Sequence, residues 1–182
     1  MSQTFPTLDT PRLRLRPFTA NDLEDYTRLI FADAEVIRYL PSRDLPPLER
    51  ARRALTYFED HWVQRNFGVW AVTDKVDGRL IGHCGLNHLD ENGEVEVMYA
   101  LAKADWGRGI ATEAADASLR FGFEQFKLER IIGLAMHANI ASRRVLEHIG
   151  LTYEREVHYW GVDLMVYATT LEQFIRNRTA TG

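Results

Sequence analysis

Two periods of apolar and polar residues divide the chain into strands and helices. Segment 12–16 alternates arginine with leucine between two prolines, which predicts a strand with one buried face. Later segments have the same strand character, and polar turns rich in Asp and Gly separate several of them: 69–73, 80–86, 94–101, 130–136, 151–159 and 162–169. We therefore expect about seven strands.

Apolar residues recur every three or four positions in the segments between these strands. This spacing predicts amphipathic helices at 23–30, 48–62, 111–126, 140–149 and 170 to about 176. Gly150 follows the fourth of these and is expected to end it. Strands and helices in this mixed order predict an α+β (mixed α/β) fold in which helices cover a central, mostly antiparallel, twisted sheet.

Composition changes this picture little. The chain has 182 residues, of which 46% are hydrophobic and 26% charged, with no repeat, linker or low-complexity segment, so we expect one domain over residues 1–182. A net charge of −4 argues against a nucleic-acid partner held through phosphate neutralisation. An acidic surface suits a cationic substrate.

Targeting and metal signals are weak. The N-terminus lacks a basic region followed by an apolar stretch, and no run approaches the roughly 20 apolar residues of a membrane span, so a soluble, cytoplasmic protein is expected. The single cysteine, Cys84, lies in an apolar run and is expected to be buried and inert. Six scattered histidines and one cysteine do not have metal-ligand spacing, so no metal is predicted.

The most informative stretch is 99–113, YALAKADWGRGIATE, in which a strand ends and two glycines open a helix. Gly107 and Gly109 allow main-chain amides to approach a ligand, and amides at a helix N-terminus suit a pyrophosphate. Arg108 could add a cation and Thr112 a hydroxyl; the alternative is a simple glycine turn. The Walker A and dinucleotide-binding patterns both fail here, because the required lysine and third glycine are missing.

This loop resembles the coenzyme A pyrophosphate loop of the GNAT superfamily of N-acetyltransferases, Q/R-x-x-G-x-G/A, with Trp106 in place of the usual Gln or Arg. The string WGRGIATEA resembles the branch that acetylates ribosomal-protein N-termini, the RimJ/RimL type. Other positions that match this branch are Leu13, Arg14, Leu15, Arg16, Glu96, Tyr99, Asn139, Ser142, Gly150 and Leu151. The resemblance covers about residues 11–169.

The resemblance implies a sheet of about seven strands flanked by about four to five helices, with the fourth and fifth strands splayed apart. Acetyl-CoA is the implied cofactor, with its pantetheine arm in the gap, hydrogen-bonded to the fourth strand at Tyr99, Ala100 and Leu101. The other implied cofactor contacts are Trp106, Gly107, Arg108, Gly109, Ile110, Ala111, Thr112, Asn139, Ser142 and Arg143.

Acetyl transfer to an amine requires a base and a proton donor for the departing thiolate. Glu96 precedes the cofactor end of its strand and is the candidate base, the alternative being an exposed or salt-bridged carboxylate. Ser142 is the candidate donor by resemblance, although Asn139 and Ser142 could also cap their helix. Arg143 and its neighbour Arg144 could meet a ribose phosphate or only form a solvated face.

The acceptor is expected to enter from the side opposite the cofactor, past segment 36–44 and the turn 159–162. Tyr39, Tyr159 and Trp160, with Asp44, could hold an amine by charge and cation–π contact. The expected acceptor is a primary amine, with a protein N-terminal α-amino group as one candidate and a small amine as the alternative. A non-catalytic acyl-CoA binding domain is a third interpretation, and the protein is expected to be a monomer or a homodimer.

Overall fold

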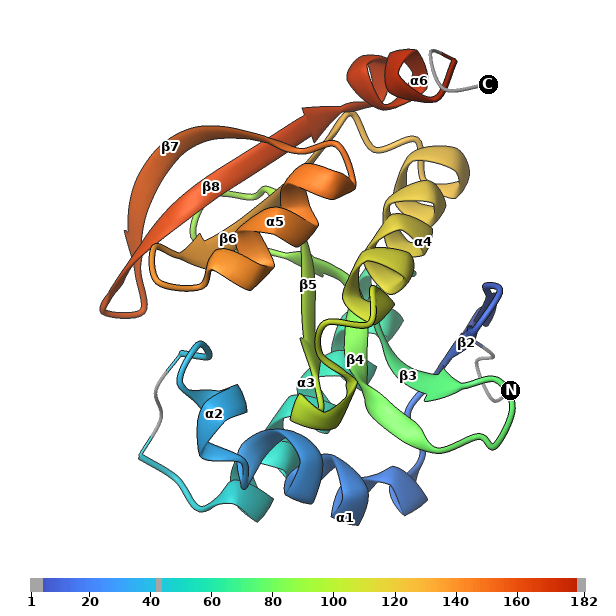
Figure 1. The fold of residues 1–182 in the computed structure, drawn as a ribbon, viewed down its shortest axis with the longest axis vertical. Helices are drawn as coiled ribbons and strands as arrows, with labels where there is room; N and C mark the ends of the chain where they lie inside the picture. Colours follow the sequence, from blue (N-terminus) through green and yellow to red (C-terminus); the bar gives the residue numbers. More distant parts are fainter. Residues whose placement is uncertain (1–4, 42–43, 180–182) are drawn as a thin grey trace.

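The computed structural model describes residues 5–41 and 44–179. In this part of the chain, strands β1 to β8 form one sheet in the spatial order β1-β2-β3-β4-β5-β6-β8-β7 (Figure 1). All neighbouring strands are antiparallel except β5 and β6, which are parallel. The strands are β1 (Leu8–Asp9), β2 (Leu13–Arg16), β3 (Val69–Asp74), β4 (Leu80–His88), β5 (Val95–Leu101), β6 (Arg130–Met136), β7 (Thr152–Tyr159) and β8 (Val162–Thr170).

The helices cover both faces of this sheet. They are α1 (Leu23–Tyr26), α2 (Ala34–Ile37), α3 (Pro47–Arg65), α4 (Ile110–Gln125), α5 (Ile140–His148) and α6 (Leu171–Thr179), with short turns of tighter or wider helix at η1 (Ala20–Asp22), η2 (Thr27–Phe31) and η3 (Lys103–Asp105). The segments α1 to α3 lie against one face, while α4 and α5 lie against the other (Figure 1). This arrangement confirms the predicted helix-covered mixed sheet.

Two details were beyond the sequence patterns. The two-residue strand β1 adds an eighth strand at the sheet edge by pairing Leu8 with Leu15, and a strand this short shows no alternation. The short helix α2 begins where the Asp33 side chain accepts a hydrogen bond from the Glu35 amide at 2.9 Å. Both elements are stabilised by their neighbours rather than by a periodic stripe of their own.

Strands β5 and β6 diverge along their length. Their only ladder pair in the described chain is Glu96 with Ile132, whereas β5 pairs with β4 along its whole length. The predicted splay of the fourth and fifth long strands is therefore present, and the gap opens toward the end of β5 that leads into the glycine loop.

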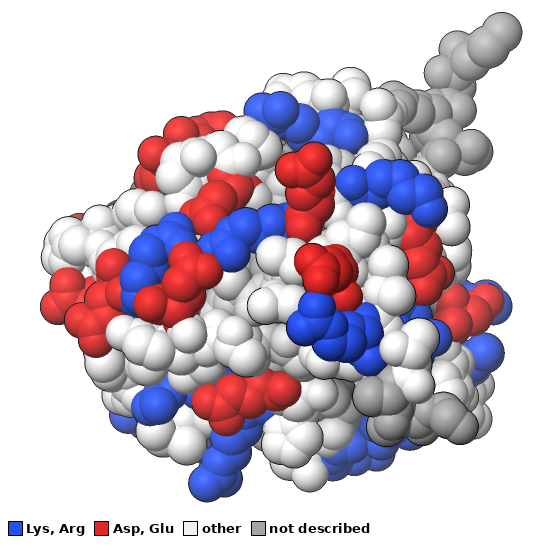
Figure 2. Space-filling model, turned by 90° about the horizontal axis from the view of Figure 1, so that it is seen from above, with Lys and Arg blue, Asp and Glu red and all other residues white. Residues whose placement is uncertain are grey.

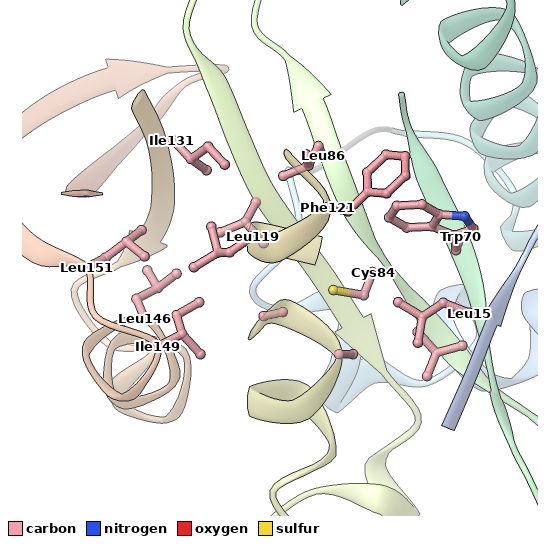
Figure 3. Close-up of a cluster of buried hydrophobic side chains, with 14 of the residues drawn as sticks. Leu15, Trp70, Cys84, Leu86, Leu119, Phe121, Ile131, Leu146, Ile149 and Leu151 are labelled. Carbon is pink, nitrogen blue, oxygen red and sulfur yellow. The ribbon is translucent and has the colours of Figure 1, made fainter. Parts of the chain in front are cut away.

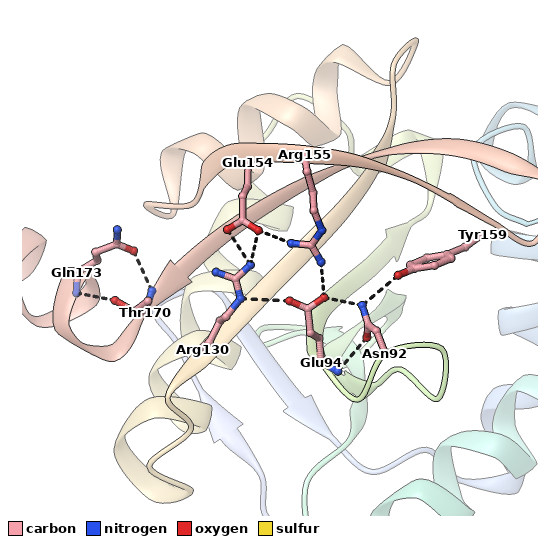
Figure 4. Close-up of polar contacts among 8 residues, drawn as sticks. All are labelled: Asn92, Glu94, Arg130, Glu154, Arg155, Tyr159, Thr170 and Gln173. Atoms are coloured by element: carbon pink, nitrogen blue, oxygen red, sulfur yellow. Dashed lines mark hydrogen bonds and ion pairs between the residues drawn. The ribbon is translucent and has the colours of Figure 1, made fainter.

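An ion-pair network ties the closed end of this gap. Glu94, just before β5, accepts hydrogen bonds from Arg130 at 3.1 Å and from Arg155 of β7 at 2.6 Å (Figure 4). Arg130 begins β6 and also contacts Glu154 through two bonds of 2.8 Å. These bonds thus hold β5 and β6 together near their Glu96–Ile132 pair, and the two strands separate beyond it.

The larger core cluster fills the space between the sheet and helices α4 and α5 (Figure 3). Leu15, Trp70, Cys84 and Leu119 are fully buried in it, as the alternating and helical patterns predict. Gly133 lets α5 approach β6 closely, because a Cβ there would lie 2.3 Å from a methyl carbon of Leu146. This close approach packs α5 directly against β6, the strand that borders the gap.

Charges of both signs are interspersed on the face seen in Figure 2, where blue and red side chains are mostly adjacent and neither sign forms a continuous field. None of the described helices is long and apolar enough to cross a bilayer.

Candidate functional site

A cavity of about 1050 Å³ begins in the gap between β5 and β6 and continues toward α2 and α3. We call its two ends the loop end and the aromatic end. The loop end is lined by residues 105–107 and 109–112, by β5 and by the start of α5. The aromatic end is lined by side chains of η2, α2 and the turn after it, α3, β4, the β4–β5 loop and the β7–β8 tip, including Phe31, Tyr39, Tyr57, Phe58 and Trp160.

The loop end presents main-chain amides. Gly107 and Gly109 have φ of 71° and 73°, in the left-handed region that favours glycine, and Gly109 caps α4 without a side-chain bond. The first bond within the helix runs from the Glu113 amide to the Gly109 carbonyl at 3.1 Å. The amides of Ile110, Ala111 and Thr112 therefore have no partner within the helix, and its dipole makes this end attractive to an anion.

The β2 edge holds this helix start in place. Glu113 accepts hydrogen bonds from the Thr10 hydroxyl at 2.6 Å and from the Arg12 amide at 2.9 Å, and its second oxygen pairs with the Arg12 guanidinium. Arg12 also donates to the Arg108 carbonyl at 2.8 Å. The loop is thus fixed by bonds to the β1–β2 connection before any ligand binds.

Arg108 does not line the cavity. Its guanidinium donates to Asp105 at 2.6 Å, and Asp105 also accepts two bonds of 2.8 Å from Arg79. The hydrogen bonds from Arg79 hold the pKa of the Asp105 carboxyl below its usual range. Arg108 therefore helps to stabilise the loop. Its guanidinium, which was expected beside the helix amides, is bonded to Asp105 instead.

Alternate residues of β5 direct their main-chain groups into the gap. The Ala102 amide donates to Ile81 of β4 at 2.8 Å, so the residues two and four before it, Ala100 and Met98, also face β4. Tyr99 and Leu101 then direct their amides and carbonyls away from β4, into the gap. The Leu101 carbonyl accepts the indole N–H of Trp106 at 2.8 Å, which gives that tryptophan a structural role in closing the loop.

The start of α5 brings two hydroxyls together. Asn139 caps the helix, since its side chain accepts the Ser142 amide at 3.1 Å, so the capping interpretation is confirmed for this residue. The Ser142 Oγ lies 3.0 Å from the Tyr99 hydroxyl, which also donates to the Ser142 carbonyl at 3.1 Å. Burial raises the pKa of Tyr99, so its phenol stays protonated. Asn139, Ser142 and Tyr99 all line the cavity.

Arg143 and Arg144 lie on different sides of α5. Arg143 donates to the Tyr167 hydroxyl at 3.0 Å and to the His137 carbonyl at 3.3 Å, and it does not line the cavity. Arg144 lines it, as does His148 one turn later. Residues four apart share a helix face, so of the two neighbouring arginines of α5 it is Arg144 that lies beside the cavity.

Glu96 lies in the middle of the cavity wall and is buried, with 7% of its surface exposed. In the described chain it forms no ion pair, and its hydrogen bond comes from the Asn87 side chain to Oε1 at 3.0 Å. Burial raises the pKa of the Glu96 carboxyl to about 7, with a further increase from the charge of Glu91. The alternative of an exposed or salt-bridged carboxylate is therefore wrong, and Glu96 can exchange a proton near neutral pH.

The aromatic end contains two of the three predicted acceptor residues. Tyr39 and Trp160 line the cavity, whereas the Tyr159 hydroxyl accepts a bond from Asn92 at 3.0 Å outside it. The Trp160 indole donates to Glu91 at 2.7 Å, which joins the β7–β8 tip to the β4–β5 loop. Asp44 does not line the cavity, and residues 42 and 43 of the predicted segment lie outside the described residues.

Several residues that line the cavity were not predicted from the sequence. Asn87 and Tyr57 form a hydrogen-bonded pair beside Glu96, and Arg50 and Arg53 bring cations from α3. The pair had no sequence signal, because the strand and the helix that bring it together are 30 positions apart. Arg50 and Arg53 lie three positions apart on this helix, and each lies four positions before another cavity residue, Ala54 or Tyr57, a weak signal that has no meaning until the cavity is known.

Two residues in the middle of β4 behave as core residues. His83 is fully buried, its Nδ1 lies 2.9 Å from the Tyr26 hydroxyl, and burial lowers its pKa to about 3. Cys84 is buried, and its pKa is raised to about 12, so it is not a nucleophile at neutral pH. No group of three or more metal-ligating side chains is found within residues 5–41 and 44–179.

The geometry of this gap agrees with a family comparison. Residues 12–152 match the family model described as an acetyltransferase (GNAT) domain. The chain belongs to the GNAT acetyltransferase family. Among curated relatives, YkkB of Bacillus subtilis is 32% identical over 167 residues, covering 88% of this chain and 93% of that protein. The N-acetyltransferase p20 of Bacillus licheniformis is 30% identical, covering 82% and 83%.

Solved GNAT structures share the fold. An acetyltransferase from Agrobacterium tumefaciens superposes with a TM-score of 0.80 at 27% identity, covering 93% of this chain and 96% of that one. RimJ of Mycobacterium smegmatis, solved with CoA-disulfide, gives 0.74 at 20% identity, covering 91% and 89%. The family uses acetyl-CoA, and the chain is accordingly an acetyltransferase enzyme.

Proposed function

We propose that this GNAT enzyme binds acetyl-CoA at the loop end of the cavity and transfers the acetyl group directly to a primary amine that enters from the aromatic end. The observation that carries the proposal is the single cavity that joins unpartnered helix amides to a buried carboxylate of raised pKa. An anion site and a base in one cavity are what acetyl transfer from a coenzyme A thioester needs.

The loop end fits the cofactor residue by residue. The amides of Ile110, Ala111 and Thr112 would hold the pyrophosphate, with Gly107 and Gly109 leaving room for it. The gap-facing main chain of Tyr99 and Leu101 would bond the pantetheine arm, while Ala100 would contribute only its side chain. Arg144, rather than Arg143 or Arg108, would meet a phosphate of the adenosine part.

The chain's own residues would move two protons. Acetyl-CoA supplies a thioester carbonyl that an uncharged amine can attack. Glu96 would take the proton from the incoming ammonium group, because its raised pKa suits a base near neutral pH. Ser142 would donate to the departing sulfur, and the Tyr99 hydroxyl 3.0 Å away would orient and resupply it.

The acceptor class follows from the walls of the aromatic end. Its lining combines aromatic rings and the carboxylates of Asp90, Glu91 and Glu96 with the cations of Arg50 and Arg53. Aromatic and acidic groups suit an amine, but two arginines oppose a polyamine by charge repulsion. A protein N-terminal α-amino group or a small monoamine fits better, and two solved neighbours bear the names of ribosomal-protein acetyltransferases.

Calorimetric titration with acetyl-CoA tests the cofactor part of the proposal. Wild-type protein is expected to bind with micromolar affinity, about −8 kcal/mol, and Gly109→Val to lose this binding. Gly78→Val is the matched control, since Gly78 has φ of 75° in the distant β3–β4 turn with no heavy atom near an added Cβ. A non-catalytic acyl-CoA binding domain would bind acetyl-CoA without releasing thiol to any amine. Failure of the wild type to bind acetyl-CoA or coenzyme A would overturn the proposal.

A further inference from the structure

The two oxygens of Glu96 have different surroundings. Oε1 accepts the Asn87 side-chain N–H at 3.0 Å. Within the described residues Oε2 accepts no hydrogen bond. It is not fully buried either, so its surface is open to the cavity that Glu96 lines. One oxygen is therefore held by the sheet, and the other faces the space where the acceptor amine would lie.

Asn87 lies opposite Glu96 in the β4–β5 ladder and is itself buried, with 8% of its surface exposed. An amide has a donor end and an acceptor end, so its direction matters. The acceptor end is occupied by the Tyr57 hydroxyl of α3, which donates to Asn87 Oδ1 at 2.6 Å. With that bond made, the donor end points to Glu96.

We propose that Asn87 and Tyr57 are positioning residues for the base: Asn87 fixes Oε1 of Glu96, Tyr57 fixes the direction of the Asn87 amide, and Oε2 is thereby directed at the acceptor amine. In this inference the role of Glu96 as base is taken from the proposed function. The arrangement of the three side chains is seen in the structure and does not depend on that role. Neither Asn87 nor Tyr57 belongs to a GNAT motif in this sequence.

The physical argument concerns the ionised form of Glu96. A hydrogen bond donated to a carboxylate favours its charged state and opposes the cost of burial. If the Asn87 side-chain amide rotated by about 180°, its carbonyl oxygen would face the Glu96 carboxylate and disfavour the charged state of Glu96. The turn would also break the bond that the Tyr57 hydroxyl donates to Asn87 Oδ1, and the phenol would then have to reorient and accept an N–H instead.

Other groups near Glu96 act differently. The titratable and charged side chains on the surrounding elements include Arg50, Arg53 and His61 of α3, His83 and His88 of β4, and Asp90 and Glu91 of the β4–β5 loop, besides Tyr57 itself. Burial keeps His83 neutral and lowers the pKa of His61. The charge of Glu91 raises the pKa of Glu96, so it works against the hydrogen bond from Asn87.

The experiment is a direct titration of Glu96 by carbon-13 NMR, in protein labelled at the glutamate carboxyl carbon, with Glu96→Gln used to assign the resonance. In the wild type this carboxyl is expected to titrate near pH 7. Asn87→Leu, which keeps the volume and removes the donor, should move the midpoint up by about one pH unit. Tyr57→Phe should move it in the same direction by a smaller amount, and the control Glu91→Gln should move it down.

An unchanged midpoint in Asn87→Leu would overturn the proposal, and so would an unchanged midpoint in Tyr57→Phe if the leucine variant does not fold. In thiol-release assays, the acid limb of kcat/KM should move with the NMR midpoint, whereas a merely structural role would lower activity equally at every pH. Because the titration needs neither acetyl-CoA nor an acceptor, a wild type that titrates as expected but releases no thiol would overturn the proposed function alone.

Discussion

The loop end and the aromatic end of the cavity are built from different parts of the chain. At the loop end the consecutive segment 99–112 supplies main-chain amides and carbonyls, and the start of α5 adds a few side chains. At the aromatic end the groups that face a ligand are side chains, supplied by helices, strands and loops from Tyr26 to Leu164. The first arrangement suits a ligand shared by a whole family, and the second can change with single substitutions.

Replacing Glu96 by Gln should have the largest effect of any single change at the junction of the two ends. Loss of the base is expected to lower kcat for thiol release by about 10²-fold to 10⁴-fold. Affinity for acetyl-CoA, set by the loop end, should stay within about twofold by calorimetry. Unchanged turnover would remove Glu96 from the chemistry and would leave the junction without a base.

Ser142→Ala tests the second proton. Turnover should fall by about 100-fold, because the donor to the departing sulfur is lost. The cap of α5 should survive, since Asn139 bonds the amide of residue 142 rather than its hydroxyl. Tyr99→Phe is the companion variant and should have a smaller effect. Full activity in Ser142→Ala, with normal binding, would assign the role to another group.

Glu96 is also expected to lower stability at high pH. Its pKa is raised from an ordinary value near 4.5 to about 7 in the folded protein. Below pH 4.5 the carboxyl is protonated in both folded and unfolded chains, and between pH 4.5 and 7 only the unfolded chain releases the proton. Stability is therefore lost progressively as the pH rises through this window.

Glu96→Gln should remove that loss. Urea unfolding at pH 8 should show the variant more stable by up to about 3 kcal/mol, and the difference should nearly vanish at pH 4. Equal stability at pH 8 would show that the carboxyl is not penalised by burial. A less stable variant would mean that ionised Glu96 has a partner in solution.

The two neighbouring arginines of α5 give the smallest effect and the sharpest contrast. Arg144→Ala should weaken acetyl-CoA binding about twofold to fivefold at low salt, with less effect at high salt, because an exposed ion pair contributes up to about 1 kcal/mol. Arg143→Ala should leave affinity unchanged, since its guanidinium is bonded to Tyr167. The reverse result would mean that the cofactor lies on the other side of the helix.

The contrast between main-chain groups at the loop end and side chains at the aromatic end also explains which parts of the structure the sequence could predict. Alternation and helical spacing identify the long strands and helices, and Gly107 and Gly109 mark the loop before α4 because main-chain geometry requires particular residues there. The orientation of Arg143 and Arg108 was not predictable, because it depends on partners such as Tyr167 and Asp105. A resemblance transfers positions along the chain, while side-chain direction depends on contacts.

The aromatic end was the least predictable part. Asn87 and Tyr57 meet only when α3 packs on β4, and no periodicity of either segment indicates that meeting. Trp160 could be proposed from its type and place in a turn, but its bond to Glu91 and the position of Tyr159 outside the cavity depend on tertiary packing. Composition alone therefore indicates an amine acceptor without its identity.

The central claim is acetyl transfer through this one cavity, and amine-dependent thiol release from acetyl-CoA tests it most directly. Purified protein would be assayed with a panel of N-terminal peptides, small monoamines and polyamines, beside Glu96→Gln. We predict release that requires an acceptor, favours monoamines or peptide N-termini over polyamines, and falls by at least about 100-fold in the variant. Release from wild type and variant at equal rates, or none with any amine although acetyl-CoA binds, would contradict the account.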